Sequence, residues 1–167
     1  LGCPARMAAY AIAKDIEMLN FSGKLYGSST GYLMVQVPNA LATGAFYALP
    51  VSGLVLPGFK DKPFNAHITV MRPDEVQRVG GMEKINERGR DFRYAIVGGD
   101  SVPSGSSSDD YSRYWFLKVQ SAELAELRRT YGLPSEPAVP FHITFAARPR
   151  HVLRDNGISK LTEAFEL

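Results

Sequence analysis

Cysteine is nearly absent from this sequence, because Cys3 is the one thiol among 167 residues. A single cysteine cannot form a disulfide within the chain, and it excludes zinc sites built from two or more thiolates. Long hydrophobic runs are missing as well, since Gly44, Pro50 and Gly53 interrupt the most apolar stretch, around residues 41–56. We therefore expect no transmembrane helix, no membrane partner and a cytoplasmic location.

A large excess of charge of either sign is also missing. Nineteen Lys and Arg residues face 17 Asp and Glu residues, which leaves a formal net charge of +2. Proteins that coat duplex nucleic acid carry a stronger and clustered basic excess, so we expect no duplex DNA partner. A hydrophobic content of 45% with 22% charged residues excludes intrinsic disorder and is typical of a globular chain. We predict one domain over residues 1–167, although the chain starts without Met and so allows a fragment of a larger protein.

The same order of predicted elements occurs twice along the chain. Each copy has an apolar strand, then a polar helix cap, an amphipathic helix, and a second strand that contains His-Ile-Thr. The order predicts two similar lobes, about 32–71 and about 113–147, in an α+β fold. The elements are a strand over 32–37, a helix capped by Asn39, a strand over 65–71, a strand over 114–119, a helix capped by Ser121 and a strand over 140–146.

Weaker patterns lie outside the two copies. Residues 5–20 have helical spacing of apolar side chains, and residues 21–31 are rich in turn residues. The remaining predictions are a short helix opened by Pro73, a strand over 92–97, a mobile loop over 101–110, and a tail over 151–167 ending in a short helix. Residues 104–110 of the loop are either a lid over the cleft or a tolerated insertion.

Two of the three histidines open the same tripeptide, His67-Ile68-Thr69 and His142-Ile143-Thr144. Alternate side chains of a strand share a face, so each His lies beside its own Thr and opposite the apolar Ile. Strands 32–37 and 114–119 alternate in the same way. Each lobe is thus predicted to have one core face and one solvated face. If a pseudo-twofold axis relates the lobes, both His and Thr pairs line one cleft.

Such a cleft suits acid–base chemistry. A histidine with a pKa near 6.5 can give or take a proton at neutral pH, so one imidazole can act as base while the other acts as acid. Threonine hydroxyls can donate to a non-bridging phosphate oxygen and stabilise its charge in the transition state. This set of groups fits in-line displacement at phosphorus and needs no metal or other cofactor.

The paired motifs resemble the His-x-Thr/Ser signature of the 2H phosphoesterase superfamily, which includes RNA 2′,3′-cyclic phosphodiesterases and phage enzymes that degrade the cyclic-oligonucleotide signals of CBASS defence. The resemblance covers about residues 32–147. It implies a bilobal α+β fold of two pseudo-symmetric antiparallel-sheet lobes, with outer helices around a central cleft. By motif match, His67 and His142 take the acid and base roles, and Thr69 and Thr144 contact the phosphate. Residues 31–39 and 65–73 also look similar to phage proteins akin to the anti-CBASS enzymes.

Side chains on the solvated strand faces are candidates for substrate binding. Aromatic rings there can stack on a nucleobase, and a lysine can meet a phosphate. The candidates are Tyr32, Tyr114, Phe116 and Lys118. The predicted function is metal-independent cleavage of an RNA-like phosphodiester, either a cyclic oligonucleotide messenger or a 2′,3′-cyclic phosphate, in the host cytoplasm if the chain is phage-encoded.

Other interpretations stay open at this point. The same residues suit cleavage of 2′-5′ oligoadenylate or linear RNA, and a nucleotide-binding domain of a larger phage protein needs no turnover. A zinc site through His67, His142 and His151 would leave both threonines unexplained. The sequence leaves undetermined the base, linkage and ring size of the substrate, the roles of the two histidines and the oligomeric state.

Overall fold

The structure, a computed structural model, describes residues 20–57, 64–108 and 110–150. The predicted helix over 5–20 and the tail over 151–167 lie outside the described residues, except that Asn20 begins a strand. The elements are β1 (Asn20–Gly27), β2 (Leu33–Gln36), α2 (Asn39–Ala48), β3 (His67–Met71), α3 (Pro73–Arg78), the 3-10 helix η1 (Met82–Lys84), β4 (Asp91–Pro103), β5 (Tyr111–Gln120), α4 (Ala122–Thr130) and β6 (His142–Pro149).

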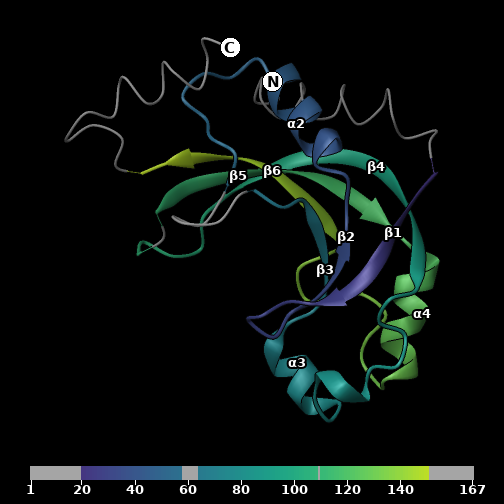
Figure 1. Ribbon diagram of the computed structural model, residues 1–167. Helices are drawn as coiled ribbons and strands as arrows, with labels where there is room; N and C mark the ends of the chain where they lie inside the picture. Colours follow the sequence, from purple (N-terminus) through teal and green to yellow (C-terminus); the bar gives the residue numbers. More distant parts are fainter. Residues whose placement is uncertain (1–19, 58–63, 109, 151–167) are drawn as a thin grey trace.

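Six strands form one sheet in the order β3-β2-β1-β4-β5-β6, and every neighbouring pair is antiparallel. The sheet is strongly bent, with β4 and β5 arching over the shorter strands (Figure 1). β1 and β4 pair at the middle of the sheet, so the sheet has two halves of three strands each, β3-β2-β1 and β4-β5-β6. The predicted α+β class with antiparallel strands and helices outside the sheet is confirmed.

Each half of the sheet is one copy of a longer repeat than the sequence pattern indicated. The order in the first half is β1-β2-α2-β3, and the order in the second half is β4-β5-α4-β6. The strand that opens each unit pairs with its counterpart at the middle of the sheet. Consequently the two strands that begin with histidine, β3 and β6, lie at the two edges.

The prediction of a loop over 21–31 is wrong, because residues 20–27 form β1. Gly23 and Leu25 are buried on one face of this strand, while Ser22 and Lys24 are exposed on the other. Position 23 requires glycine, because a Cβ there would collide with the backbone carbonyl oxygen of Gln36 on β2. Glycine, serine and lysine are common in turns, which is why the sequence predicts a loop here. In β1, Gly23 lies on the close-packed face, and Ser22 and Lys24 lie on the solvated face.

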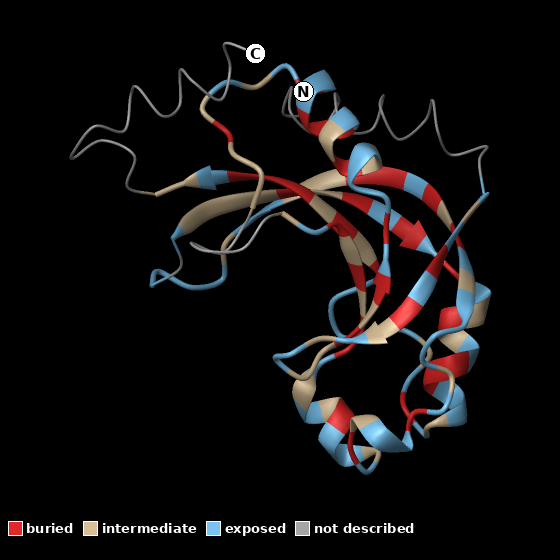
Figure 2. Ribbon diagram, in the orientation of Figure 1, coloured by how far each residue is buried: buried red, intermediate tan, exposed pale blue. Residues whose placement is uncertain are grey.

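The helices pack across the two halves. Helix α2 of the first unit contacts β6 of the second, and α4 of the second unit contacts β4 and also β3 of the first. The bent sheet also brings β3 and β6 into contact with each other. Buried and exposed positions alternate along the strands (Figure 2). The core therefore lies on one sheet face, beneath the helices, and leaves the other face for the side chains of the His and Thr positions.

Two further predictions need correction. Residues 101–103 of the predicted loop belong to β4 and pair with β5, so the connection between these strands is shorter than predicted. Asn39 is not the cap of α2, since Pro38 holds that position. Instead the Asn39 side chain accepts a hydrogen bond from the backbone N–H of Ala66 (2.8 Å) and donates to the Phe64 carbonyl (3.2 Å), which fixes the segment entering β3. Ser121 does cap α4, accepting from the N–H of Leu124 at 3.1 Å.

Over the described ranges, every helix is too short or too polar to cross a membrane.

Candidate active site

Both His-Ile-Thr tripeptides begin an edge strand. His67 opens β3 and His142 opens β6. Ile68 and Ile143 are fully buried, whereas each histidine and threonine keeps part of its surface exposed. The alternation predicted from the sequence is therefore present in both halves, with the His and Thr side chains opposite the core.

The neighbours of the two motifs occupy equivalent places. In the first half, His67 pairs with Gln36 and Thr69 pairs with Met34. In the second half, the partners across the ladder are Lys118 for His142 and Phe116 for Thr144. The geometry is repeated while the chemistry of the neighbouring side chains differs.

A matching irregularity follows each threonine. The pairing register shifts by one residue there, leaving Val70 of β3 and Phe145 of β6 without a ladder partner. These β-bulges bury two consecutive apolar residues, Val70 with Met71 and Phe145 with Ala146. The sequence contains the signal for both bulges, because two apolar residues in succession break the strict alternation of a strand.

Each histidine ring is held by the same backbone contact. Nδ1 of His67 lies 2.8 Å from the Asn65 carbonyl oxygen, and Nδ1 of His142 lies 2.7 Å from the Pro140 carbonyl oxygen. A carbonyl oxygen only accepts, so Nδ1 of each ring carries the proton and donates it. In the neutral ring this leaves Nε2 as the proton acceptor, which is the tautomer that a general base needs.

The charge of His67 also acts on the titration of His142. Partial burial lowers the pKa of His142 below its ordinary value of 6.5, and the nearby charge of His67 lowers this pKa further. The hydrogen bond to the Pro140 carbonyl opposes these effects, since it stabilises the protonated ring. His142 therefore favours its neutral form near pH 7.

A buried arginine supports the first motif from the second half of the fold. Arg128 of α4 is 1% exposed, and its Nη1 donates to the carbonyl oxygen of Val70, the bulge residue after Thr69, at 2.7 Å. Its guanidinium also donates to both carboxylate oxygens of Glu75 (3.0 and 2.7 Å), and its Nε donates to the Pro134 carbonyl (2.7 Å). The pairing lowers the pKa of Glu75. Arg128 thus ties β3 to α3 and to the segment that leads toward His142.

Three of the four predicted substrate-binding residues line one cleft with the second motif. The cleft has a volume of about 780 Å³, and Tyr114, Phe116 and Lys118 lie along it together with His142 and Thr144. The Phe116 ring meets the His142 ring edge to face, with centroids 5.5 Å apart. The Lys118 ammonium lies 3.9 Å from a carboxylate oxygen of Asp100.

Tyr32 is not brought together with the other three candidates. It precedes Leu33, which pairs with Met71, so its position is at the end of β3 away from His67. Its backbone N–H donates to the Ser28 hydroxyl at 3.0 Å within the turn between β1 and β2. The residues beside His67 are instead Gln36 and Asn65. The Asn65 amide donates to the Tyr26 hydroxyl at 3.3 Å, and that hydroxyl contacts the Met34 sulfur at 3.4 Å.

The sequence does not single out Gln36 and Asn65, because they are ordinary polar residues with no motif of their own. The alternation did place Met34 and Gln36 on the same face as Tyr32, and the register of the second half supplies their equivalents, Phe116 and Lys118. Within residues 20–57, 64–108 and 110–150, no group of three or more His, Cys, Asp and Glu side chains gathers as a metal site. His151 and Cys3 lie outside the described residues.

Together, these features place two histidines at equivalent positions of a pseudo-symmetric sheet, each held by the same backbone contact. Residues 31–153 match the family model described as "Swiss Army Knife, 2H phosphoesterase domain". The match contains both motifs and covers most of the chain, so this chain belongs to the 2H phosphoesterase family. Searches of curated proteins and of solved structures gave no match.

Proposed function

We propose that this chain is a metal-independent phosphodiesterase in which His67 and His142 act as acid and base. The observation that carries the proposal is the pair of equivalent hydrogen bonds from Nδ1 to a backbone carbonyl two residues earlier. These bonds fix the ring and leave Nε2 for proton exchange in both halves. Catalysts of this type need two groups of opposite protonation on either side of the reacting phosphorus.

The proposed reaction is an in-line displacement. One imidazole accepts the proton of the attacking oxygen, that of water or of a ribose hydroxyl, as the new P–O bond forms. The opposite bond to the leaving oxygen breaks, and the second imidazolium donates its proton to that oxygen. The Thr69 and Thr144 hydroxyls donate to the non-bridging oxygens and stabilise their charge in the transition state. Burial and the charge of His67 lower the pKa of His142, which favours its neutral form near pH 7.

The proposed substrate class is an RNA-like phosphodiester, either a cyclic oligonucleotide messenger, as in phage anti-CBASS enzymes, or a 2′,3′-cyclic phosphate. The cleft that contains Tyr114, Phe116 and Lys118 supports this class, since aromatic rings stack on bases and an ammonium attracts phosphate. A substrate-binding role for Tyr32 remains a prediction.

Incubation with a panel of cyclic dinucleotides, cyclic trinucleotides, 2′,3′-cyclic mononucleotides and 2′-5′ oligoadenylate, read by chromatography, tests the proposal. We expect product from at least one of these substrates, with the same rate in the presence of EDTA. Binding without product would contradict the proposal and favour a non-catalytic nucleotide-binding domain. A rate that EDTA abolishes and added metal restores would contradict the metal-independent mechanism.

A further inference from the structure

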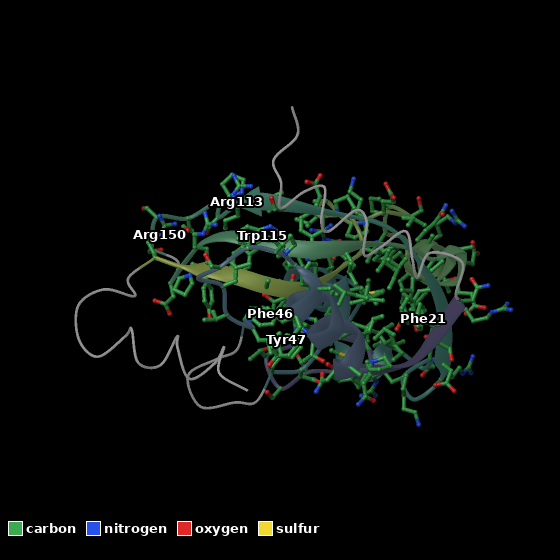
Figure 3. All side chains as sticks on the ribbon, turned by 90° about the horizontal axis from the view of Figure 1, so that it is seen from above. Phe21, Phe46, Tyr47, Arg113, Trp115 and Arg150 are labelled. Carbon is green, nitrogen blue, oxygen red and sulfur yellow. The ribbon has the colours of Figure 1, made fainter. Side chains whose placement is uncertain are left out.

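Exposed apolar side chains gather at the cleft beside His142. Three of the four large hydrophobic residues that are exposed within the described ranges lie there, namely Val97 (44% exposed), Val102 (44%) and Val139 (58%). The fourth, Tyr47, is 63% exposed and lies beside Phe46 on α2 (Figure 3), and it is not among the residues that line the cleft. Apolar surface that stays exposed and gathers in one hollow marks a ligand site.

The valines come from two segments that flank β5. Val97 of β4 has no ladder partner in β5, because the register shifts between Ile96 and Gly98, and Val102 of β4 pairs with Tyr114. Val139 comes from the segment that follows α4 and leads into β6. Between them, β5 carries Tyr114 and Phe116 along the cleft.

The corresponding hollow in the first half is polar. Its volume is about 410 Å³, and it lies beside Gln36 and Asn65, the two residues next to His67. The other side chains with polar or charged groups that line it are Ser22, Lys24, Asn39 and Asp91. The pseudo-symmetry of the backbone is therefore not matched by symmetry of the two binding surfaces.

We propose that the cleft beside His142 is the enzyme's single nucleobase subsite, so that the substrate binds in one direction, with one base at His142 and a polar, base-free group at His67. This inference rests on the proposed phosphodiesterase function and narrows its substrate class. A substrate with one nucleoside next to the scissile phosphate, such as a 2′,3′-cyclic nucleotide, fits both surfaces. The valines are the specificity-determining residues.

The valine-lined part of the cleft is continuous with the side chains of the second motif, so a group bound there belongs to the substrate. His142 and Thr144 form part of the same cleft wall as the valines. Lys118, Phe116 and Tyr114 succeed one another on one face of β5 at roughly 7 Å intervals. A phosphate held near His142 and Lys118 thus places the attached base over the aromatic and valine side chains, at the distance that a ribose spans.

Titration calorimetry with adenosine 2′-monophosphate and with ribose 2-phosphate tests the inference without requiring turnover. We expect the wild-type chain to bind the adenosine compound about fivefold to a hundredfold more tightly, the range expected for stacking of one base. Val139→Asn, an uncharged change on an exposed segment, and the isosteric triple variant V97T/V102T/V139T should lose most of this difference. Their affinity for ribose 2-phosphate should not change.

Tyr47→Thr is the matched control, because it removes an exposed large hydrophobic side chain away from the cleft. It should bind both compounds as the wild type does. Equal wild-type affinities for the two compounds, or a loss in Val139→Asn that affects both equally, would overturn the single-base subsite. Chain association that buries Val139 and excludes the nucleotide would overturn it as well. Hydrolysis of adenosine 2′,3′-cyclic phosphate is measured separately, so tight base-dependent binding without turnover would contradict the proposed function alone.

Discussion

The two histidines are the residues whose local chemistry is most constrained by the backbone. Each Nδ1 donates to the backbone carbonyl two residues earlier, just before the strand begins. The backbone conformation there therefore sets the orientation of the ring, without an acidic side chain. Their spacing in sequence predicted the shared face, but the carbonyl contacts depend on how the residues before each strand turn. A single sequence contains no pattern that predicts that turn.

Replacement of His67 should change the titration of His142. The charge of His67 contributes to the lowered pKa of His142, so His67→Gln should raise that pKa toward its ordinary value. NMR titration of the His142 ring measures the change directly. Gln36→Ala is the control, since it alters the neighbour of His67 without altering the charge. An unchanged His142 pKa in His67→Gln would show that the two rings do not share a site.

Stability should also depend on His142 in a defined direction. Its pKa is lower in the folded chain than in the unfolded chain, so the unfolded chain binds more protons below about pH 6.5. The contribution of neutral His142 is therefore complete above that pH and is lost as the pH falls toward the folded-state pKa. Urea unfolding at pH 7.5 and pH 5.0 should show a larger loss for the wild type than for His142→Gln, which cannot titrate. Equal losses would contradict the assignment.

At the scale of elements, the sequence predicted the strands and helices that contain periodic apolar residues, and it failed where polar or small residues form a strand. β1 was missed because its Ser, Gly and Lys residues are common in turns, and the length of β4 was underestimated because Ser101 and Pro103 extend it. Both strands are specified by pairing with distant strands rather than by local preference. The paired bulges could have been recognised from Val70-Met71 and Phe145-Ala146.

A comparison of Gly23 in β1 with Gly44 in α2 tests how closely β1 packs against β2. Gly23→Ala should destabilise the fold by about 1–3 kcal/mol, because the added Cβ meets the Gln36 carbonyl and the Val35 side chain. Gly44→Ala, in the interior of α2 with open space around its Cβ, should stabilise the chain by about 0.5–1 kcal/mol. Urea unfolding of both variants checks the signs. A neutral Gly23→Ala variant would contradict the close contact between β1 and β2.

At the scale of the whole molecule, the site depends on contacts between the two halves. α2 and α4 each pack against an edge strand of the other unit, and Arg128 connects the bulge after Thr69 with α3 and with the segment after α4. The sequence predicted two similar lobes, whereas the partners of Arg128 are up to 58 residues away in the chain and have no local signature. The asymmetry of the two binding hollows likewise emerges only when distant strands pair.

The buried ion pair should therefore contribute more than an exposed one on the same helix. Arg128→Met leaves Glu75 and two backbone carbonyls without their donor, and should cost about 3–5 kcal/mol of unfolding free energy. Arg129→Met breaks an exposed pair with Glu126 and should cost at most about 1 kcal/mol. Denaturant titrations compare the two. Similar losses would show that Arg128 is not a link between the halves.

The two His-x-Thr motifs are proposed to form one reaction site. The decisive measurement is the turnover rate of His67→Ala, His142→Ala and the double variant on the best substrate of the panel, with folding checked by circular dichroism. Groups that act as a unit are not additive, so each single variant should lose roughly 10³-fold or more in kcat, and the double variant should lose little beyond that. Full activity in either single variant, or losses that simply multiply in the double variant, would contradict the account.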